Sequence, residues 1–365
     1  MKAKYGGQPY DEEKYNETLK KAVDDVVRRQ VECGIDIVTD GEFSKPGFFT
    51  YIRDRLDGFE SRPGIKLKLF EQEVAAFPEY YEQYFKQAML GGAIVSLGPV
   101  VCVGPVKYRG EKLVQIDIDN VKAAAAAAGV ANEHVFLPAT APSGVGINEY
   151  YKSDEEYFHA LAAEMSKEYR AIVDAGILVQ IDDPFLPDIF YEVGLDDAQK
   201  KRRAQIFVEA INTALKGIPP EYVRFHTCYG INEGPRIYEA ALKDIIEYVL
   251  TINAGSYSFE AANPRHEHEY HLFEQVKVPE GKVLVPGVVT HASNIVEHPE
   301  LIAERIIRFA RLVGRENVIA GADCGFSSQA LYNTEVHPTV VWEKFKAMRE
   351  GANIATQQLW AKRGG

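Results

Sequence analysis

Four residues near the ends of three strand-like runs carry the side chains of a metal site. The run YVRFHTC ends with His226 and Cys228, which the two-residue repeat of a strand would point to the same face. The run SYSFEAA carries Glu260 near its end, and the run NVIAGADC ends with Cys324. Zinc accepts imidazole, thiolate and carboxylate ligands together, whereas soft sulfur ligands disfavour magnesium and calcium. The set therefore predicts a zinc site, although His226 and Cys228 alone would also suit a barrel core.

The elements that would position these ligands alternate along the chain. Apolar residues recur at helical spacing from Tyr15 to Cys33, and Gly34 follows as a helix stop. Strand-like runs that end in polar or small residues are IDIVTDGE, VFLPAT, ILVQIDD, YVRFHTC, SYSFEAA, VLVPGVV and NVIAGADC. Strands alternating with helices predict right-handed strand-helix-strand units and a parallel sheet. Seven such runs are one short of a closed eight-stranded barrel, and the eighth strand stays unassigned.

The chain is predicted to form a single α/β barrel domain over residues 1–365. Its 365 residues fit the size of single barrels with insertions, roughly 200 to more than 400 residues. Residues 49–109 interrupt the alternation, and we expect them to form an insertion, a hairpin or helical lid over the barrel. The segment IVSLGPVVCVGPVKY, with its internal Gly-Pro pairs, would supply the hairpin. Aromatic residues that this insertion would bury are Phe77, Tyr80, Tyr81, Tyr84 and Phe85.

Composition argues against two classes of partner. The formal net charge of -12 and the lack of a long basic run oppose nucleic-acid binding, which needs Lys and Arg to neutralise phosphates. The most apolar stretch, residues 91–106, is interrupted by Gly and Pro and is shorter than the roughly 20 residues of a membrane helix. The N-terminus also lacks the apolar core of a signal peptide. We therefore expect a cytoplasmic protein without nucleic-acid or membrane partners.

The remaining cysteines and a histidine cluster are predicted to be structural. Cys33 lies at a helix end and Cys102 in an apolar segment, where a thiol behaves as a small hydrophobic side chain. His266, His268 and His271 follow Pro264 at a spacing that resembles neither a helical nor a finger-type metal site. Glutamates alternate with them in the sequence. A hydrogen-bonded loop that contacts the site or its lid is therefore favoured over a second metal site.

The runs HTCYG, SFEAANPRHEHE and VIAGADCGF resemble the zinc-binding pattern of the cobalamin-independent methionine synthase family. The similarity is to the catalytic C-terminal barrel, and most of all to the single-barrel branch that includes epoxyalkane:coenzyme M transferases. It extends from about Tyr10 to the end through TDGEFSKP, VCVGPVKY, FLPATAPSGV and VQIDDP. The resemblance implies a TIM (β/α)8-type barrel of the methionine synthase/uroporphyrinogen decarboxylase kind. It also implies the ligand set His226, Cys228, Glu260 and Cys324.

The resemblance implies a thiol-activating mechanism. A free thiol with a pKa of about 8.5 is only a few per cent ionised at pH 7, whereas a zinc-bound thiol is deprotonated. Two cysteine thiolates would keep the site electron-rich, so that a substrate sulfur stays reactive toward carbon electrophiles. We hypothesise that Glu260 is the labile fourth ligand, which an entering substrate thiol displaces.

The resemblance also implies residues that hold the substrate and move a proton. Glu42 and Asp182 match the family positions that bind the amino group of homocysteine, with capping or barrel-rim acids as the structural alternative. Asp183 stands where the synthases carry Glu. His291 matches a histidine that transfers a proton to the leaving group, which makes it a candidate general acid. Thr290 stands where that family has an Asp, so the local match is loose.

One departure from the family concerns the start of the barrel. The family opens with a strand carrying a Val-Gly-Ser-Leu-Pro-like motif, which this sequence does not contain. We therefore expect the first barrel strand to be missing from this chain. The N-terminal barrel that helps long synthases bind polyglutamylated folate is absent as well, which widens the range of alkyl donors.

The leading functional hypothesis is zinc-dependent S-methyl transfer to homocysteine or a similar small thiol. Methyl-folate, a corrinoid protein or an epoxide are the candidate alkyl donors. The first alternative is an epoxyalkane:coenzyme M transferase, whose sulfonate would call for Arg or Lys where Glu42 and Asp182 stand. A second alternative, from another class, is a non-catalytic zinc-binding or corrinoid-partner protein. A homo-oligomer is compatible with the sequence.

Overall fold

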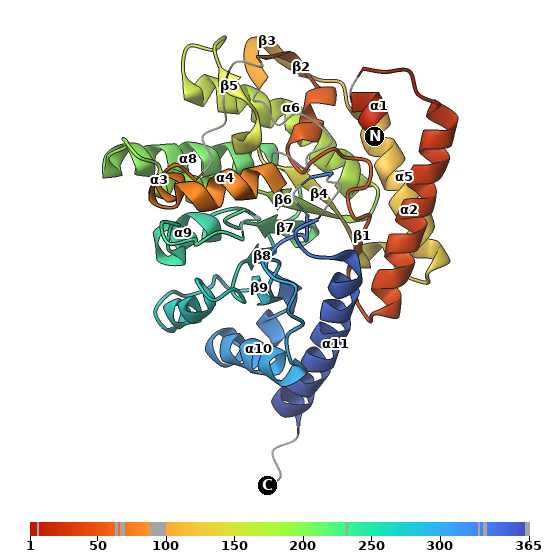
Figure 1. Cartoon of the computed structure of the whole chain (residues 1–365), viewed down its shortest axis with the longest axis vertical. Coiled ribbons are helices and arrows are strands. Elements are labelled where there is room, and N and C mark those ends of the chain that lie inside the picture. The colour runs from red at the N-terminus through yellow and green to blue at the C-terminus, as the bar shows by residue number, and fades with distance from the viewer. Residues whose placement is uncertain are drawn as a thin grey trace.

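Seven parallel strands form one curled sheet in the middle of the molecule (Figure 1). The computed structural model describes residues 1–5, 7–62, 65, 70–87, 100–230, 233–327, 329–330 and 334–361. In spatial order the strands are β1 (Val38–Thr39), β4 (Val135–Thr140), β6 (Leu178–Asp182), β7 (Val223–His226), β8 (Ser256–Phe259), β9 (Val283–Val289) and β10 (Gly321–Ala322). Each lies within one of the seven predicted runs. The fold is thus α/β with a curled parallel sheet, consistent with a TIM-type barrel.

Within the described residues, β1 and β10 are the two edges of this sheet. β10 pairs with β9, and β1 pairs with β4. In a closed eight-stranded barrel one further strand would lie between these edges. The predicted absence of a first strand stays a prediction.

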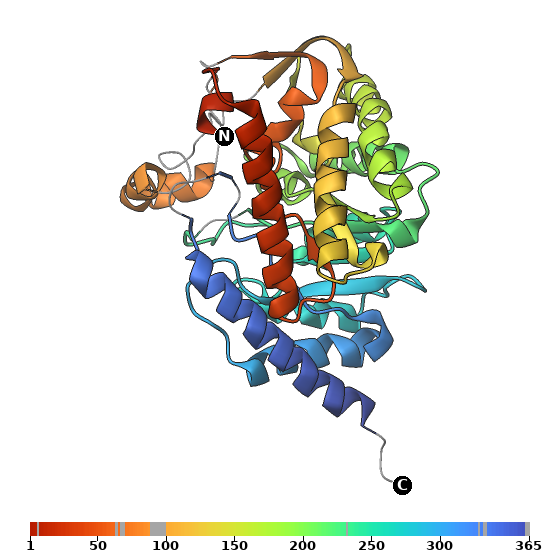
Figure 2. The ribbon, with the colours of Figure 1, turned by 90° about the vertical axis from the view of Figure 1, so that its right-hand side faces the viewer.

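Helices cover the outer face of the sheet (Figures 1 and 2). The longer ones are α2 (Glu12–Glu32), α5 (Glu111–Ala127), α6 (Asp154–Asp174), α8 (Asp197–Ala214), α9 (Leu242–Leu250), α10 (Pro299–Val313) and α11 (Pro338–Trp360). The shorter ones are α1 (Lys2–Tyr5), α3 (Glu71–Ala76), α4 (Pro78–Gln87) and α7 (Phe185–Tyr191). The 3-10 turns are η1 (Thr50–Asp54), η2 (Asn132–His134), η3 (Pro142–Gly144), η4 (Pro220–Tyr222), η5 (Glu267–Glu274) and η6 (Arg315–Asn317).

Helix α2 begins three residues earlier than its apolar pattern suggests. The side chain of Asp11 accepts a hydrogen bond from the backbone N–H of Lys14 at 3.0 Å, which caps the first turn. Gly34 follows the helix with a positive φ of 81°, as expected of a helix stop. In Figure 2, α2 lies beside α5, and the two helices are in contact.

Alternate side chains along each strand point to opposite faces of the sheet, either outward to the hydrophobic core beneath the helices or inward to the barrel interior. On β7, Val223 and Phe225 point outward into the hydrophobic core beneath the helices and are almost fully buried. Arg224 and His226 therefore point to the opposite face, into the barrel. On β6, Val179 and Ile181 belong to the same core. The polar side chains of these strands are thus collected inside the barrel.

Residues 49–109 contribute two strands to a second, three-stranded sheet. β2 (Leu56–Ser61) pairs antiparallel with β3 (Val100–Tyr108), and β3 also pairs in parallel with β5 (Ile147–Asn148). The strand partner of β3 is thus β2, rather than a second strand inside the Gly-Pro-rich segment; residues 88–99 of that segment lie outside the described residues. The pairing register shifts where Gly58 faces Pro105. A Cβ at Gly58 would lie 2.7 Å from the Pro105 carbonyl oxygen, so this approach requires glycine.

A buried ionic cluster fastens this segment to the helices of the barrel. The guanidinium of Arg55 binds Glu168 of α6 with an N–O distance of 3.0 Å, and it also binds Asp117 of α5. Tyr51 and Tyr108 donate hydrogen bonds to the two carboxylate oxygens of Glu168 at 3.0 and 2.8 Å. Burial alone would raise the pKa of Glu168, but the positive charge of Arg55 outweighs it and lowers that pKa. The ion pair between Glu168 and Arg55 is therefore maintained despite its burial.

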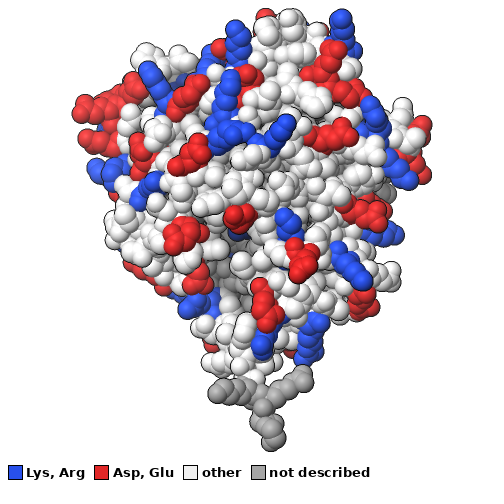
Figure 3. All heavy atoms as spheres, turned by 180° about the vertical axis from the view of Figure 1, so that it is seen from behind, with Lys and Arg blue, Asp and Glu red and all other residues white. Residues whose placement is uncertain are grey.

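Acidic and basic side chains are interspersed on the face of the molecule seen in Figure 3. Among the described residues, no helix combines the length and the apolar character required to cross a bilayer.

The substitution Glu168→Gln should lower the free energy of unfolding by about 3–5 kcal/mol, because it breaks a buried ion pair and leaves Arg55 undercompensated. Urea denaturation at pH 7, followed by circular dichroism, measures this loss. Glu32→Gln is the matched control, since Glu32 forms an exposed ion pair with Arg28 on α2 and should cost less than about 1 kcal/mol. Equal losses in the two variants would contradict the structural role of the cluster.

Candidate metal centre

Three of the four predicted ligands converge at one end of the barrel. The ligand atoms of His226, Cys228 and Cys324 all lie within 4.8 Å of one another. The two sulfur atoms are 3.4 Å apart, although Cys228 follows β7 and Cys324 follows β10. Both cysteines are free thiols. One imidazole and two thiols in this arrangement are a donor set that suits zinc.

The imidazole of His226 is oriented from inside the barrel. Its Nδ1 atom lies 3.1 Å from the hydroxyl of Ser258 on β8, and the same hydroxyl accepts a hydrogen bond from Arg224 at 3.2 Å. Burial, followed by the positive charge of Arg224, lowers the pKa of His226 to about 3, so that the ring is neutral. The other nitrogen, Nε2, is buried without a hydrogen-bond partner among the described residues. A neutral imidazole with one orphaned nitrogen is what a metal ligand requires, so these residues fit zinc.

The thiol of Cys228 requires a cation to ionise. Its hydrogen bond with Cys324, burial and the charges of Cys324 and Glu260 all raise its pKa. A thiol in such surroundings stays protonated at neutral pH. A divalent cation held by the two sulfurs would reverse this effect, because a coordinating thiol is deprotonated.

The fourth predicted ligand, Glu260, is bound by other groups in this structure. Its carboxylate accepts hydrogen bonds from the backbone N–H of Tyr229 at 2.8 Å and from Asn263 at 2.5 Å. It also forms an ion pair with Arg236 at 2.9 Å. Glu260 is close enough to raise the pKa of Cys228, so it stands beside the three converging ligands rather than among them.

Glu260 instead forms a second group with His291 and Asp323. The ligand atoms of these three buried residues lie within 4.8 Å of one another. Asp323 uses one carboxylate oxygen to accept hydrogen bonds from the backbone N–H groups of Ala261 and Ala262, each at 2.8 Å. Buried polar atoms without a hydrogen-bond partner in the described structure gather here: both ring nitrogens of His291, Oδ2 of Asp323, Nη1 of Arg236 and Nε2 of His226. Buried polar atoms without a partner are costly, so their concentration here indicates a site for a polar ligand or ion.

His291 is held in place by its neighbours in the chain. The backbone N–H of Thr290 donates to Glu297 at 2.7 Å, and Glu297 forms an ion pair at 2.9 Å with the fully buried Lys344 of α11. Burial, more than any charge, lowers the pKa of His291 to about 4. The ring is therefore neutral at pH 7, and it must accept a proton before it can act as the general acid predicted from the sequence.

The two predicted substrate-binding carboxylates lie near each other and near cations. Burial and the charge of Glu42 raise the pKa of Asp182 to about 8. Asp182 is paired in strand register with His226, which places it beside the metal ligands. Glu42 forms a 3.0 Å ion pair with Lys45, and Arg224 is close enough to lower the pKa of Asp182. Each acid thus has a positively charged neighbour, which sequence reasoning did not foresee.

Asp183, the neighbour of Asp182, has a capping role. It accepts hydrogen bonds from the backbone N–H groups of Phe185 and Leu186 at the start of α7, both at 3.1 Å, and from the hydroxyl of Ser143 at 2.8 Å. These bonds satisfy donors that the first turn of a helix leaves free.

The three clustered histidines do not converge on one point. His266 is buried and lies between two carboxylates, with Glu269 at 2.7 Å and Glu239 at 3.0 Å. His271 is exposed and pairs with Glu274, while His268 is exposed as well. Burial alone would lower the pKa of His266, but its two glutamates outweigh burial and raise that pKa to about 9. The ring of Tyr229 stacks on His266 with a centroid distance of 4.0 Å.

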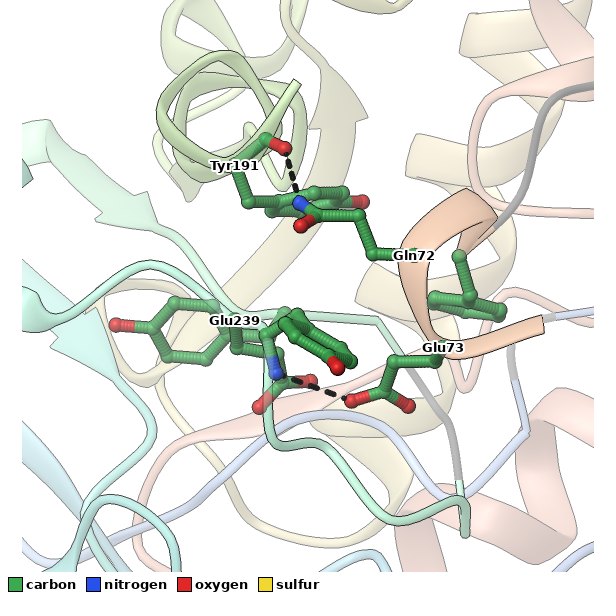
Figure 4. A pocket seen from close by; sticks show the side chains of 7 residues that line it. Gln72, Glu73, Tyr191 and Glu239 are labelled. Atoms are coloured by element: carbon green, nitrogen blue, oxygen red, sulfur yellow. Dashed lines mark hydrogen bonds between the residues drawn. The ribbon is translucent and has the colours of Figure 1, made fainter. Parts of the chain in front are cut away.

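A small aromatic pocket borders the site (Figure 4). It lies where α3 meets the end of α7 and the loop that follows β7. Gln72 donates a hydrogen bond to the Tyr191 carbonyl at 2.8 Å, and Glu73 accepts one from the backbone N–H of Tyr238 at 3.2 Å. Residues lining it are Phe70, Gln72, Glu73, Tyr191, Tyr229, Tyr238 and Glu239.

Sequence reasoning missed several residues that shape the site. Arg236 and Glu239 lie in the segment GPRIYEAA, which has no metal-binding spacing, and only the fold brings them to Glu260. Ser258 could have been found as the residue two positions before Glu260, within the same strand-like run. Asp323 precedes Cys324 directly, so its place near the barrel mouth was available as a signal.

Comparisons with known proteins agree on one family. A family model described as cobalamin-independent synthase, catalytic domain, matches residues 1–350. Methionine synthase from Thermococcus kodakarensis is 26% identical over 352 residues, which are 95% of this chain and 86% of that protein. Methionine synthase from Saccharolobus solfataricus is 24% identical over 356 residues, covering 95% of this chain and 88% of that protein.

Solved structures show the same fold. The B12-independent methionine synthase from Shewanella sp. W3-18-1, in complex with selenomethionine, has a TM-score of 0.73 and 19% identity. The alignment covers 96% of this chain and 92% of that one. A putative vitamin-B12 independent methionine synthase from Listeria monocytogenes has a TM-score of 0.65, with coverage of 96% and 91%.

The raised pKa of His266 should make stability depend on pH. A histidine whose pKa rises from 6.5 to about 9 on folding stabilises the fold fully below pH 6.5, and this stabilisation is lost as the pH rises to 9. The shift corresponds to about 3 kcal/mol. Urea denaturation of wild type and His266→Gln across pH 6–9.5 should therefore show a gap between them that shrinks with rising pH.

His271→Gln serves as the control for this measurement. The side chain of His271 is 60% exposed, so its pair with Glu274 is screened by solvent. Its pH profile should follow that of the wild type. A gap between wild type and His266→Gln that stays constant from pH 6 to 9.5 would show that His266 does not bind its proton more tightly in the fold.

Proposed function

The chain belongs to the cobalamin-independent synthase catalytic-domain family, and from that membership and the site geometry we propose that it is a zinc-dependent thiol S-methyltransferase. The observation that carries the proposal is that the ligand atoms of His226, Cys228 and Cys324 lie within 4.8 Å of one another, while Nε2 of His226 has no hydrogen-bond partner among the described residues. Bound zinc would supply a positive centre that keeps a substrate sulfur in its thiolate form. Glu260 is proposed as the fourth ligand, because it is adjacent to these three.

Homocysteine is the thiol acceptor that the relatives favour. Proteins similar to this chain over nearly its whole length are named methionine synthases. A third relative, from Thermotoga petrophila, is named 5-methyltetrahydropteroyltriglutamate–homocysteine methyltransferase; it is 23% identical over 90% of this chain and 39% of that protein. Glu42 and Asp182 are proposed to bind the ammonium group of the acceptor, since Asp182 pairs in strand register with His226 and Glu42 lies near Asp182. Methyl-folate, a corrinoid protein or an epoxide remain the candidate donors.

The proposed roles of the chain in the reaction are positioning, exclusion of water and proton transfer. His291, neutral and with both ring nitrogens unpartnered in the described structure, would accept the proton that the thiol loses and later return it to the leaving group. Residues 49–109 are proposed to form a lid on the single barrel domain, since α3 contacts the end of α7 and the loop that follows β7. A lid at this position keeps water from a reactive thiolate.

A second candidate, transfer to the sulfonate-bearing thiol coenzyme M with opening of an epoxide, is favoured by one observation. Lys45 lies 3.0 Å from Glu42, and its ammonium group also contacts the ring of Tyr51 at 4.3 Å. Arg224 lies near Asp182. These two cations would attract an anionic head group if the carboxylates turned away or were protonated.

The cysteine variants test the zinc proposal directly. Wild-type protein should contain about one zinc per chain and should form methionine from homocysteine with one of the proposed methyl donors. Cys228→Ser and Cys324→Ser should each lose most of the zinc and at least about 1,000-fold of the methyl-transfer rate, because hydroxyls are poor zinc ligands. Elemental analysis and single-turnover assays measure both quantities.

Cys102→Ser is the matched control. This thiol is also buried, but it donates to the carbonyl of Gly104 in β3 and belongs to neither group of candidate ligands. It should keep zinc and activity. Zinc retained in both ligand variants, or full turnover by zinc-free protein, would contradict the proposal.

A panel of thiols separates the two candidate acceptors. Glu42→Gln should reduce kcat/KM for homocysteine by about 10- to 100-fold, because it removes a charged hydrogen bond to the ammonium group. Turnover of coenzyme M should not fall in that variant. In Lys45→Met, homocysteine should still be methylated. Wild-type preference for coenzyme M, abolished by Lys45→Met, would instead establish the second candidate.

A further inference from the structure

Glu260 ends a chain of buried charges that runs away from the metal ligands. Its carboxylate pairs with Arg236 at 2.9 Å, and Arg236 pairs in turn with Glu239 at 2.7 Å. Glu239 contacts His266 at 3.0 Å, and His266 contacts Glu269 at 2.7 Å. The side chains of these five residues are at most 10% exposed. Charges this deep interact strongly, because water screens them poorly.

The network contains three carboxylates and two cationic groups. Glu260, Glu239 and Glu269 contribute three negative charges, while Arg236 and a protonated His266 contribute two positive ones. One carboxylate is therefore in excess. Glu260 is the member of the network nearest the candidate metal ligands. A metal ion bound there would therefore be a third cation, and it would compete with Arg236 for the carboxylate of Glu260.

We propose that Arg236 is a positioning residue that competes with the metal for the carboxylate of Glu260 and receives it when a substrate thiol takes its place. This inference rests on the proposed function. The exchange of a carboxylate for a thiolate leaves the charge around the metal unchanged. The displaced carboxylate then needs a partner, since an unpaired charge in this interior is costly.

Arg236 is fixed in the position that this role requires. Its Nε atom is held by Glu239, so the guanidinium stays in place whether or not Glu260 is bound to it. Glu239 is itself fixed by His266, whose ring is stacked under Tyr229. The backbone of Arg236 has a positive φ of 57°, a costly conformation for a residue with a side chain. The carbonyl of Arg236 is also bound by Arg265 at 2.9 Å.

The protein groups that would bind the displaced carboxylate of Glu260 are all in place without the metal. In addition to Arg236, the backbone N–H of Tyr229 and the amide of Asn263 donate to its two oxygens. Tyr229 follows Cys228 directly, so the donor N–H is built into the ligand loop. The carboxylate therefore has two competing sets of partners within a short distance, and their balance sets how easily a thiol enters.

Zinc affinity tests the proposal without relying on turnover. Arg236→Met removes the competing partner, so Glu260 should bind the metal more strongly. The zinc dissociation constant, measured by competition with a chromophoric chelator, should fall on the order of tenfold, within the range by which residues around metal ligands alter affinity. In the Co²⁺-substituted protein, the homocysteine concentration that half-converts the thiolate charge-transfer spectrum should rise by a similar factor, because one free energy controls both shifts.

Two further variants keep the test sharp. Glu239→Gln leaves Glu260 as the only carboxylate bound to Arg236, so zinc affinity should stay the same or fall. Arg236→Lys retains a charge with a weaker single contact, and its zinc affinity should lie between those of wild type and Arg236→Met; it carries the test if Arg236→Met does not fold. Tighter zinc binding in both Arg236→Met and Glu239→Gln would show that any disruption of the charge network raises zinc affinity, and it would overturn the specific role of Arg236.

The outcomes distinguish this inference from the proposed function. Wild-type protein that binds no zinc through Cys228 and Cys324 would overturn the proposed function, and this inference with it. Wild-type protein that binds zinc, with an unchanged or weaker affinity in Arg236→Met, would overturn the role of Arg236 alone.

Discussion

The contact between Cys228 and Cys324 depends on the curvature of the sheet. β7 and β10 are separated by β8 and β9, so in a flat sheet their ends would stand about 14 Å apart at the usual strand spacing. Twist and curl of the parallel sheet bring the two sulfurs to 3.4 Å. The hydrophobic core beneath the helices maintains that curl, because Phe225 of β7 and the outward residues of the neighbouring strands pack there. Ligand geometry is thus a consequence of core packing over the whole barrel.

The same curvature brings ionisable side chains together in the buried interior of the sheet. A charge there needs a nearby opposite charge, because water does not solvate it. Arg224 lies near Asp182, Lys45 binds Glu42, and Arg236 binds Glu260. Every acid expected to bind metal or substrate therefore has a cation of this chain beside it. A metal ion or substrate ammonium group that binds one of these carboxylates must therefore replace the cationic side chain that already pairs with it. The affinity for a substrate or metal is then the difference between two strong interactions, which small changes in the surroundings can tune.

The strands and the proximity of three candidate ligands could be predicted because they depend on local patterns. Seven apolar runs with polar ends gave seven strands, and the two-residue repeat placed His226 and Cys228 on one face. The environment of Glu260 could not be predicted in this way. Its partner Arg236 lies 24 residues earlier, in a segment with no regular pattern. The pairing of β3 with β2 was hidden for a similar reason, since it joins segments on either side of two helices.

His266 can influence the candidate metal site without contacting the candidate ligands. A histidine held between two glutamates at 2.7 and 3.0 Å retains a proton at neutral pH and becomes a fixed positive charge. Without that charge, Glu239 would depend on Arg236 alone, and the guanidinium would be shared more unequally with Glu260. The segment NPRHEHE therefore acts on the candidate metal centre through the charge of His266 and is not one of its candidate ligands. In the proposed exchange, charge balance across Glu269, His266, Glu239 and Arg236 would allow Glu260 to move between Arg236 and the metal.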